Sequence, residues 1–190
     1  MKKIVIVSGL PRSGTSMMMK MLEAGGVPPL TDAERVADSD NPKGYYEWER
    51  VKKMPDGDTA WLADAAGKAV KVISALLKAL PDDYDYDVIF MERALPEVLA
   101  SQRKMLQNRG TEGDTVSDEQ MATLYERHLV AIRGWLDEQP HMRTLYVSYN
   151  DMLEEAAPHI ARINDFLGGS LDSPAMAAVI EPRLYRRRAP

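Results

Sequence analysis

The stretch from Ile4 to Ser16 constrains the fold most, because a short β-branched run leads directly into a glycine-bracketed loop. The run Ile4–Val7 predicts a buried strand, and a helical pattern begins just after the loop. Gly9 and Gly14 have the G-x-x-x-x-G spacing of a phosphate-binding loop, with Ser16 where that motif carries Ser or Thr. Such a loop points backbone N–H groups at an anion, and the following helix start adds partial positive charge. We therefore expect an anion site at the end of the first strand.

The loop departs from the nucleoside triphosphate motif at one position. Thr15 stands directly after the second glycine, where that motif carries lysine, and the loop's cation is Arg12. A P-loop kinase or nucleoside triphosphatase, which uses ATP with magnesium, is the alternative enzyme class that this lysine would mark. Glu92 resembles the acidic residue of such enzymes, but Arg93 follows it immediately.

Three more apolar runs alternate with helical patterns along the chain. We expect strands at 70–73, 88–92 and 144–148, and helices at 96–108, 117–137 and 150–167. Pro158 predicts a kink or restart in the last helix, which Asn150 or Asp151 would cap. The pattern predicts an α/β fold with a doubly wound, mainly parallel sheet of about four or five strands, P-loop NTPase-like topology and three α/β/α layers.

Composition excludes several function classes. The net charge of −5 argues against a general nucleic-acid-binding protein, which would be basic. The absence of cysteine excludes a disulfide framework, a thiolate zinc site and a cysteine nucleophile. No apolar run approaches the roughly 20 residues of a membrane span. We therefore expect one cytoplasmic domain over residues 1–190, either monomeric or homodimeric.

Two stretches, read together, resemble the sulfotransferase family that uses 3′-phosphoadenosine 5′-phosphosulfate (PAPS). The first is the loop Pro11-Arg12-Ser13-Gly14-Thr15-Ser16, which is similar to the family's Pro-Lys/Arg-Ser-Gly-Thr-Thr/Ser. The second is Arg93, after the third strand, with Ser101 eight residues later. The stretches 41–47 and 163–168 are also similar to bacterial members of the family.

The resemblance implies a small sulfotransferase that moves a sulfuryl group from PAPS to a hydroxyl or amine of a small molecule, without metal. In the family the loop holds the 5′-phosphosulfate, which here means Pro11, Arg12, Ser13, Gly14, Thr15 and Ser16. By the same resemblance, Arg93 and Ser101 hold the 3′-phosphate. Because arginine does not readily give up its proton, Arg12 would stabilise charge on the leaving oxygen electrostatically. The product would be 3′-phosphoadenosine 5′-phosphate (PAP).

The acceptor needs a general base, and the favoured candidate is Glu47, within the aromatic and acidic cluster 45–49. In the alternative, non-catalytic interpretation, Glu47 is a surface carboxylate paired with Lys43 or Arg50. His128 is a second, weaker candidate. Lys71, in the second strand, is either near the active site or a charge at a strand edge.

Residues 30–66 are expected to form a lid or insert at the acceptor site, with Tyr45, Tyr46 and Trp48 stacking on a ligand or packing the lid. The basic tail Arg186–Arg188 is either a solvated tail or a contact for the 3′-phosphate. The sequence does not identify the acceptor. A catalytically inactive nucleotide-binding regulatory protein is the alternative outside the enzymes.

Overall fold

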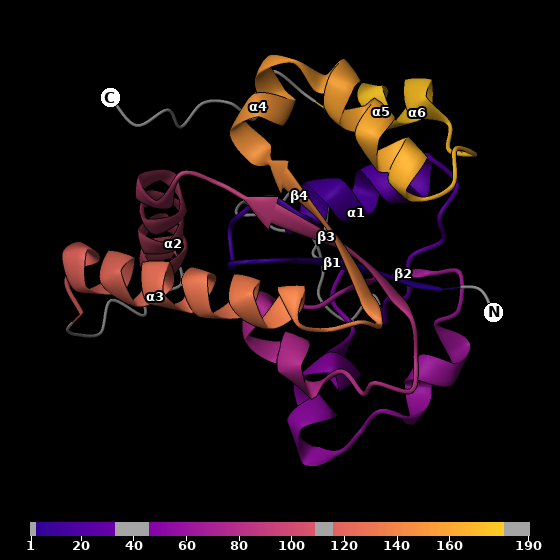
Figure 1. The fold of residues 1–190 in the computed structure, drawn as a ribbon. Helices are drawn as coiled ribbons and strands as arrows, with labels where there is room; N and C mark the ends of the chain where they lie inside the picture. The colour runs from indigo at the N-terminus through magenta and orange to yellow at the C-terminus, as the bar shows by residue number, and fades with distance from the viewer. Residues whose placement is uncertain (1–2, 33–45, 109–115, 181–190) are drawn as a thin grey trace.

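The structure, a computed structural model, describes residues 3–32, 46–108 and 116–180. Four parallel strands form one sheet in the order β2-β1-β3-β4 (Figure 1). Their bounds are β1 Ile4–Gly9, β2 Ala69–Lys71, β3 Tyr86–Glu92 and β4 Met142–Ser148. The predicted parallel sheet is confirmed.

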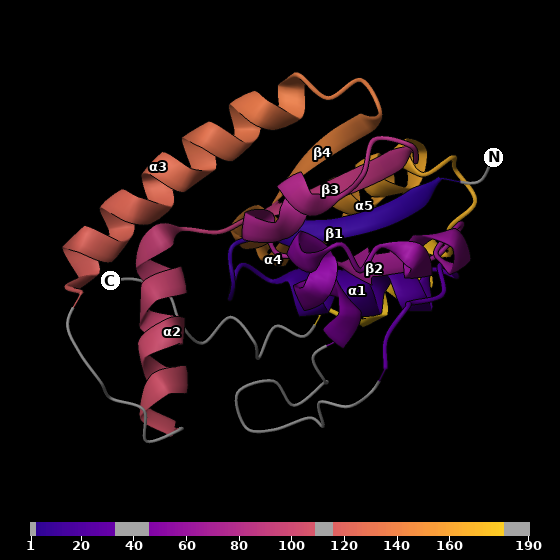
Figure 2. The same cartoon turned by 90° about the horizontal axis from the view of Figure 1, so that it is seen from below.

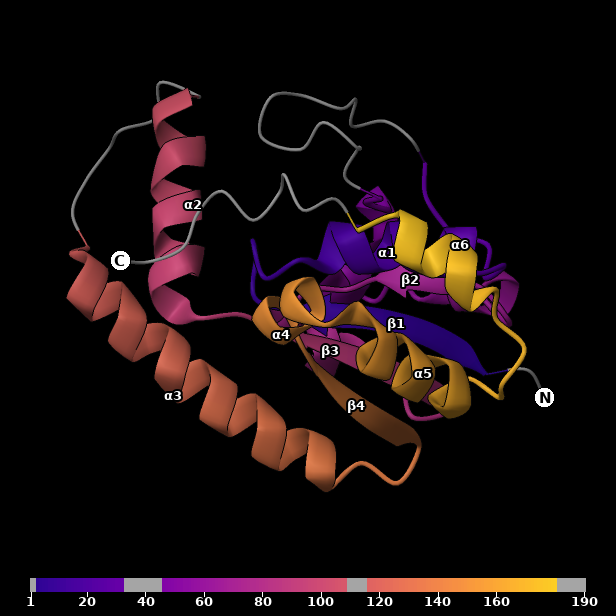
Figure 3. The same ribbon diagram turned by 90° about the horizontal axis from the view of Figure 1, so that it is seen from above.

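Strand β1 separates two hydrophobic layers, because alternate side chains of a strand point to opposite faces. Ile4 and Ile6 belong to one core, and Val5 and Val7 to the other. The first core is covered by three 3₁₀-helices and one long α-helix: η1 Glu49–Asp56, η2 Ala60–Asp64, η3 Ser74–Ala79 and α3 Asp118–Asp137. The second is covered by α1 Thr15–Ala24, α4 Tyr149–Glu154, α5 Ala156–Phe166 and α6 Ser173–Ala178 (Figures 1 and 3). The three-layer α/β/α architecture follows.

The order of the strands places a crevice at the carboxyl end of β1. The chain passes from β1 to its neighbour β2, and then to β3 on the opposite side of β1. Loops that diverge in this way leave a crevice beyond the strand ends, where ligands of open α/β sheets bind. The loop after β1 and the residue Arg93 after β3 therefore lie at the same edge.

A helical pair connects β3 to β4. Helix α2 (Leu95–Asn108) packs against α3 and stands clear of the sheet (Figure 2). A capping box, favoured by the sequence Ser117-Asp118-Glu119-Gln120, begins α3, since Ser117 and Gln120 exchange side-chain and backbone hydrogen bonds. Farther along α3, Ile132 and Leu136 are buried in the first core.

The C-terminal helical segment differs from the sequence prediction in its cap and its break. Ser148, not Asn150 or Asp151, caps α4 by accepting from the backbone N–H of Asp151. The chain breaks at Glu155 and restarts as α5, so Pro158 lies in a first turn, where a missing N–H costs nothing. The predicted restart is confirmed, a few residues before the proline.

The expected lid or insert at 30–66 is in part a component of the core. Four of its side chains are buried in the first core: Val51, Met54, Trp61 and Leu62. Residues 33–45, the polar loop at 109–115 and the tail Arg186–Arg188 lie outside the described residues. No helix among the residues described is long and apolar enough to cross a membrane.

Candidate functional site

The loop between β1 and α1 has a backbone that only a few residue types adopt. Gly9, Arg12 and Gly14 have φ values of 141°, 73° and 99°. A Cβ on Gly14 would lie 2.3 Å from the Tyr149 ring, so the ring and the loop can approach only because position 14 is glycine. Gly14 caps α1 without any side-chain hydrogen bond, which leaves the first backbone N–H groups of α1 suited to an anion.

Ser13 supports the loop from inside. Its hydroxyl donates to the carbonyl of Leu10 at 2.7 Å, its backbone N–H donates to the same oxygen at 3.1 Å, and the residue is buried. The Ser13 side chain therefore holds the loop closed, whereas the sequence analysis had placed it with the anion ligands.

The side chain of Arg12 leaves the loop toward α2. Its Nε donates to Ser101 Oγ at 3.0 Å, and Ser101 is buried on α2. The family resemblance implies that these two residues bind different ends of the donor, and the structure brings them into direct contact.

Arg93 lies under the same loop and is held on three sides. Its Nη1 donates to the carbonyl of Arg12 at 3.1 Å, and its Nε donates to Glu97 Oε2 at 2.9 Å. Its guanidinium carbon lies 4.5 Å from the centroid of the Tyr149 ring, a cation–π distance. The side chain is only 10% exposed, so Arg93 is a fixed part of the site.

A second cationic group lies on the β2 side of the loop. Lys71 Nζ donates to Ser16 Oγ at 3.3 Å and lies 3.7 Å from Glu47 Oε1. The other carboxylate oxygen of Glu47 is 3.6 Å from Lys52 Nζ. Lys71 therefore lies beside Ser16 at the start of α1, and Glu47 lies beside Lys71.

The segment that carries Glu47 is hydrogen-bonded to residues 31 and 32, which precede the stretch 33–45. Thr31 Oγ1 donates to the carbonyl of Glu47 at 2.9 Å, and the backbone N–H of Glu49 donates to Asp32 Oδ2 at 2.6 Å. Arg50 pairs with Asp58, so the pairing of Glu47 with Arg50 that the non-catalytic interpretation expects is not observed. Lys43 lies outside the described residues.

The aromatic residues next to Glu47 pack against the protein. Tyr46 donates to Glu23 Oε2 at 2.5 Å and packs on the second core, whereas Trp48 packs on the first. Burial, more than Glu23, raises the pKa of Tyr46. These contacts match the expectation of lid packing. Tyr45 lies outside the described residues.

His128 lies on the opposite layer from α1. Its Nε2 is 2.8 Å from Ser74 Oγ, and Ser74 is buried at the start of η3. Burial lowers the pKa of His128, and the nearby ammonium of Lys78 lowers it further. The lowered pKa favours the neutral imidazole as the partner of Ser74.

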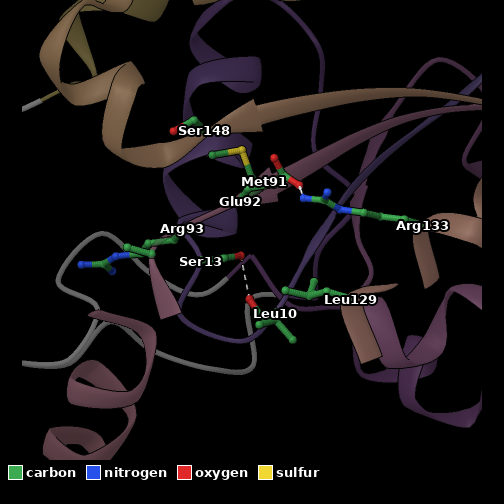
Figure 4. A pocket seen from close by; sticks show the side chains of 9 residues that line it. Leu10, Ser13, Met91, Glu92, Arg93, Leu129, Arg133 and Ser148 are labelled. Carbon is green, nitrogen blue, oxygen red and sulfur yellow. Dashed lines mark hydrogen bonds and ion pairs between the residues drawn. The ribbon is translucent and has the colours of Figure 1, made fainter. Parts of the chain in front are cut away.

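A pocket of about 210 Å³ opens between the loop, the ends of β3 and β4, and α3 (Figure 4). Glu92 borders it and forms an ion pair with Arg133, while Arg93 extends away from that pair. The carboxylate that resembled a magnesium ligand is therefore engaged by an arginine.

Comparison with protein families identifies the family of the chain. A model described as the sulfotransferase family matches residues 30–173, which is more than half of the chain. The chain belongs to the sulfotransferase family. The matched region begins after the loop and includes Glu47, Arg93 and Ser101. No protein of curated function matches this sulfotransferase.

Solved structures share the fold. The sulfotransferase domain from the curacin biosynthetic pathway aligns with TM-score 0.57 and 13% identity, over 95% of this chain and 78% of that one. The sulfotransferase domain of the Synechococcus PCC 7002 olefin synthase gives 0.54 and 15%, over 99% and 85%. Retinol dehydratase in complex with androsterone and inactive cofactor PAP gives 0.53 and 19%, over 92% and 62%. At these identities the likeness concerns the fold alone.

Sequence reasoning missed two polar residues beside Arg93. Glu97 binds the Arg93 guanidinium, and Asn150 Nδ2 donates to Glu97 Oε1 at 3.0 Å. The four-residue spacing between Arg93, just before α2, and Glu97, in the first turn of α2, was a usable signal for the first contact. No local pattern indicated the second, because Asn150 lies 53 residues from Glu97.

Proposed function

We propose that this sulfotransferase uses PAPS as donor and a hydroxyl or amine of a small molecule as acceptor, in a metal-independent in-line transfer. The observation that carries the proposal is the presence of donor groups on both sides of one anion-binding loop. Arg12, Arg93 and Ser101 lie on the β3 side, and Lys71 contacts Ser16 on the β2 side. PAPS supplies the transferable sulfuryl group and carries two separated anionic ends.

The side chains suit those two ends. Arg93 and Ser101 would bind the 3′-phosphate, because a guanidinium and a hydroxyl are strong donors to phosphate oxygens. The 5′ end would be bound by the loop Pro11–Ser16, through backbone N–H groups from Gly14 onward and the hydroxyls of Thr15 and Ser16. Ser13 would take part by holding the loop closed.

Arg12 and Glu47 would carry the chemical step. Arg12 would stabilise the negative charge that grows on the leaving phosphate oxygen, since a fixed cation is most effective where charge develops. Glu47 would accept the proton of the acceptor hydroxyl or amine as the new bond to sulfur forms. Its contact with Lys71 places it beside the loop, where the acceptor must arrive.

Two contacts favour this donor over ATP with magnesium. The Ser16 hydroxyl, which would bind magnesium in a P-loop NTPase, accepts a hydrogen bond from the ammonium of Lys71. Glu92 is paired with Arg133. Retinol dehydratase, which shares the fold, has been solved with androsterone and PAP, a small molecule and the donor's product.

The experiment compares the shifts in melting temperature produced by PAP, adenosine 5′-monophosphate (AMP) and ATP with magnesium. We expect PAP to give the largest shift, because ligand binding to the native state raises its stability. Stabilisation by ATP with magnesium alone would overturn the proposal in favour of a kinase or triphosphatase. Transfer of labelled sulfuryl from PAPS to a panel of phenols, alcohols and amines then separates an enzyme from a regulatory protein that binds PAP without turnover.

A further inference from the structure

Arg93 is surrounded by partners that fix its orientation. The nitrogens Nε and Nη1 each donate to a protein oxygen, on Glu97 and Arg12 respectively, and one face of the guanidinium lies on Tyr149. A guanidinium held in this way presents its Nη2 edge in one direction. Preorganisation of this kind lowers the entropic cost of ligand binding, because the side chain is already ordered.

Glu97 is an unexpected residue beside a site for anions. Its carboxylate is buried, and it occupies the first turn of α2, four residues after Arg93. A negative charge near a phosphate site opposes phosphate binding by simple Coulomb repulsion. Both oxygens of this carboxylate nevertheless have donors, Arg93 on one and Asn150 on the other. The pattern indicates that orientation of Arg93 outweighs the repulsion.

The side chain of Asn150 connects the segment that follows β4 to the segment that follows β3. Its Oδ1 accepts from the backbone N–H of Ala94 at 3.2 Å, and its Nδ2 donates to Glu97. Asn150 belongs to α4, directly after the end of β4, whereas Ala94 and Glu97 follow β3. The Asn150 side chain therefore contacts both the backbone just before α2 and the carboxylate that binds Arg93.

We propose that Glu97 and Asn150 are positioning residues for recognition of the 3′-phosphate, acting through Arg93. Asn150 orients the Glu97 carboxylate, and that carboxylate orients the guanidinium so that its Nη2 edge meets the phosphate. This inference rests on the proposed function, because it needs a donor with a 3′-phosphate. It assigns to the β4–α4 junction a role in nucleotide selection.

The test measures the association constants of PAP and AMP by calorimetry and compares the PAP-to-AMP ratio of these constants, which isolates the contribution of the 3′-phosphate. We expect Asn150→Ala, which removes no charge, to lower the ratio about 3- to 10-fold, the range for loss of one hydrogen bond. We expect Glu97→Gln to lower it about 10-fold or more, because a charge-assisted contact is lost. The AMP dissociation constant should stay within about twofold of wild type in both variants.

Asp87→Asn is the matched control. Asp87 is also a buried carboxylate that forms ion pairs, in its case with Lys3 and Arg143, but it lies near the amino end of β3. We expect this variant to lose stability while the PAP-to-AMP ratio stays at the wild-type value. If Glu97 acted only as a repulsive charge, Glu97→Gln would instead bind PAP more tightly, and that result would overturn the proposal.

A double-mutant cycle with Arg93→Ala shows whether the effect passes through Arg93. In that background, Glu97→Gln and Asn150→Ala should leave the ratio unchanged. Should Glu97→Gln fail to fold, Asn150→Ala carries the test by itself. A wild-type protein that does not distinguish PAP from AMP would refute the donor assignment. A PAP-to-AMP ratio that stays at the wild-type value in Asn150→Ala would refute only the positioning role.

Discussion

Arg12 Nε donates a hydrogen bond to Ser101 Oγ at 3.0 Å, across 89 positions of the chain. This contact joins the anion-binding loop after β1 to helix α2 after β3. The residues proposed for the two ends of the donor are therefore coupled by a side chain of the protein. A change at Arg12 should be felt at both ends, in turnover and in nucleotide affinity.

We expect Arg12→Ala to lower kcat for sulfuryl transfer about 100-fold, in the range for loss of one donor that stabilises a developing oxyanion. Arg12→Lys should retain more activity, because the charge is kept while the Nε contact with Ser101 is lost. Steady-state kinetics with PAPS would measure both. Arg133→Ala is the control, since Arg133 pairs with Glu92 outside this contact. Equal kcat values for Arg12→Ala and the control would contradict the role of Arg12.

Glu47→Gln should leave PAP affinity near the wild-type value and lower kcat about 100-fold or more, as expected for removal of a general base. Glu49→Gln is a matched control, because Glu49 also contacts Lys52 but is not joined to Lys71. Calorimetry and turnover on the same acceptor would separate the two effects. Unchanged turnover in Glu47→Gln would remove Glu47 from its proposed role.

Gly14 and Gly26 allow a controlled test of the loop geometry, because both have a φ of 99°. A Cβ at Gly14 would meet the Tyr149 ring at 2.3 Å, whereas a Cβ at Gly26 meets nothing within 4 Å. We expect Gly26→Ala to lower the free energy of unfolding by about 1 kcal/mol, from the left-handed backbone alone. Gly14→Ala should lose about 1–3 kcal/mol more, from overpacking against Tyr149. Urea denaturation would measure both, and equal losses would show that the ring adds no constraint.

The folded protein lowers the pKa of His128, first by burial and then through Lys78. The unfolded chain therefore binds more protons, so stability is retained above the unfolded value of about 6.5 and falls as the pH drops below it. Wild type should lose more stability than His128→Gln between about pH 8 and about pH 5, as measured by urea denaturation. Equal losses would contradict the lowered pKa. Sulfuryl transfer by His128→Gln should persist at neutral pH, because the proposed base is Glu47.

The elements built from local patterns were predictable from the sequence. The apolar run of β1, the glycines of the loop and the capping box at Ser117 each specify structure within a few residues. The motif of Arg93 after a strand and Ser101 on the following helix is likewise local, and the resemblance to the sulfotransferase family depends on it. Hydrophobic periodicity and turn-forming residues determine structure within a few positions, so they can be recognised in a single sequence.

Features that depend on distant contacts were not predictable. Asn150 or Asp151 was expected to cap the last helix, but the Asn150 side chain contacts Ala94 and Glu97, more than 50 positions away, and Ser148 caps instead. The contact of Lys71 with Ser16, 55 positions away, has no local signal either. The engagement of Arg12 with Ser101 was hidden for the same reason. Such contacts arise when the sheet brings strand ends together.

The hydrogen bonds from Thr31 to Glu47 and from Glu49 to Asp32 join the chain on either side of residues 33–45. Both bonds are formed by residues outside that stretch, so replacement of residues 33–45 leaves the partners of both bonds unchanged. Under the proposed function, a chimera that carries another sequence there should retain the wild-type affinity for PAP while its choice of acceptor changes. Such a chimera would separate recognition of the acceptor from recognition of the nucleotide.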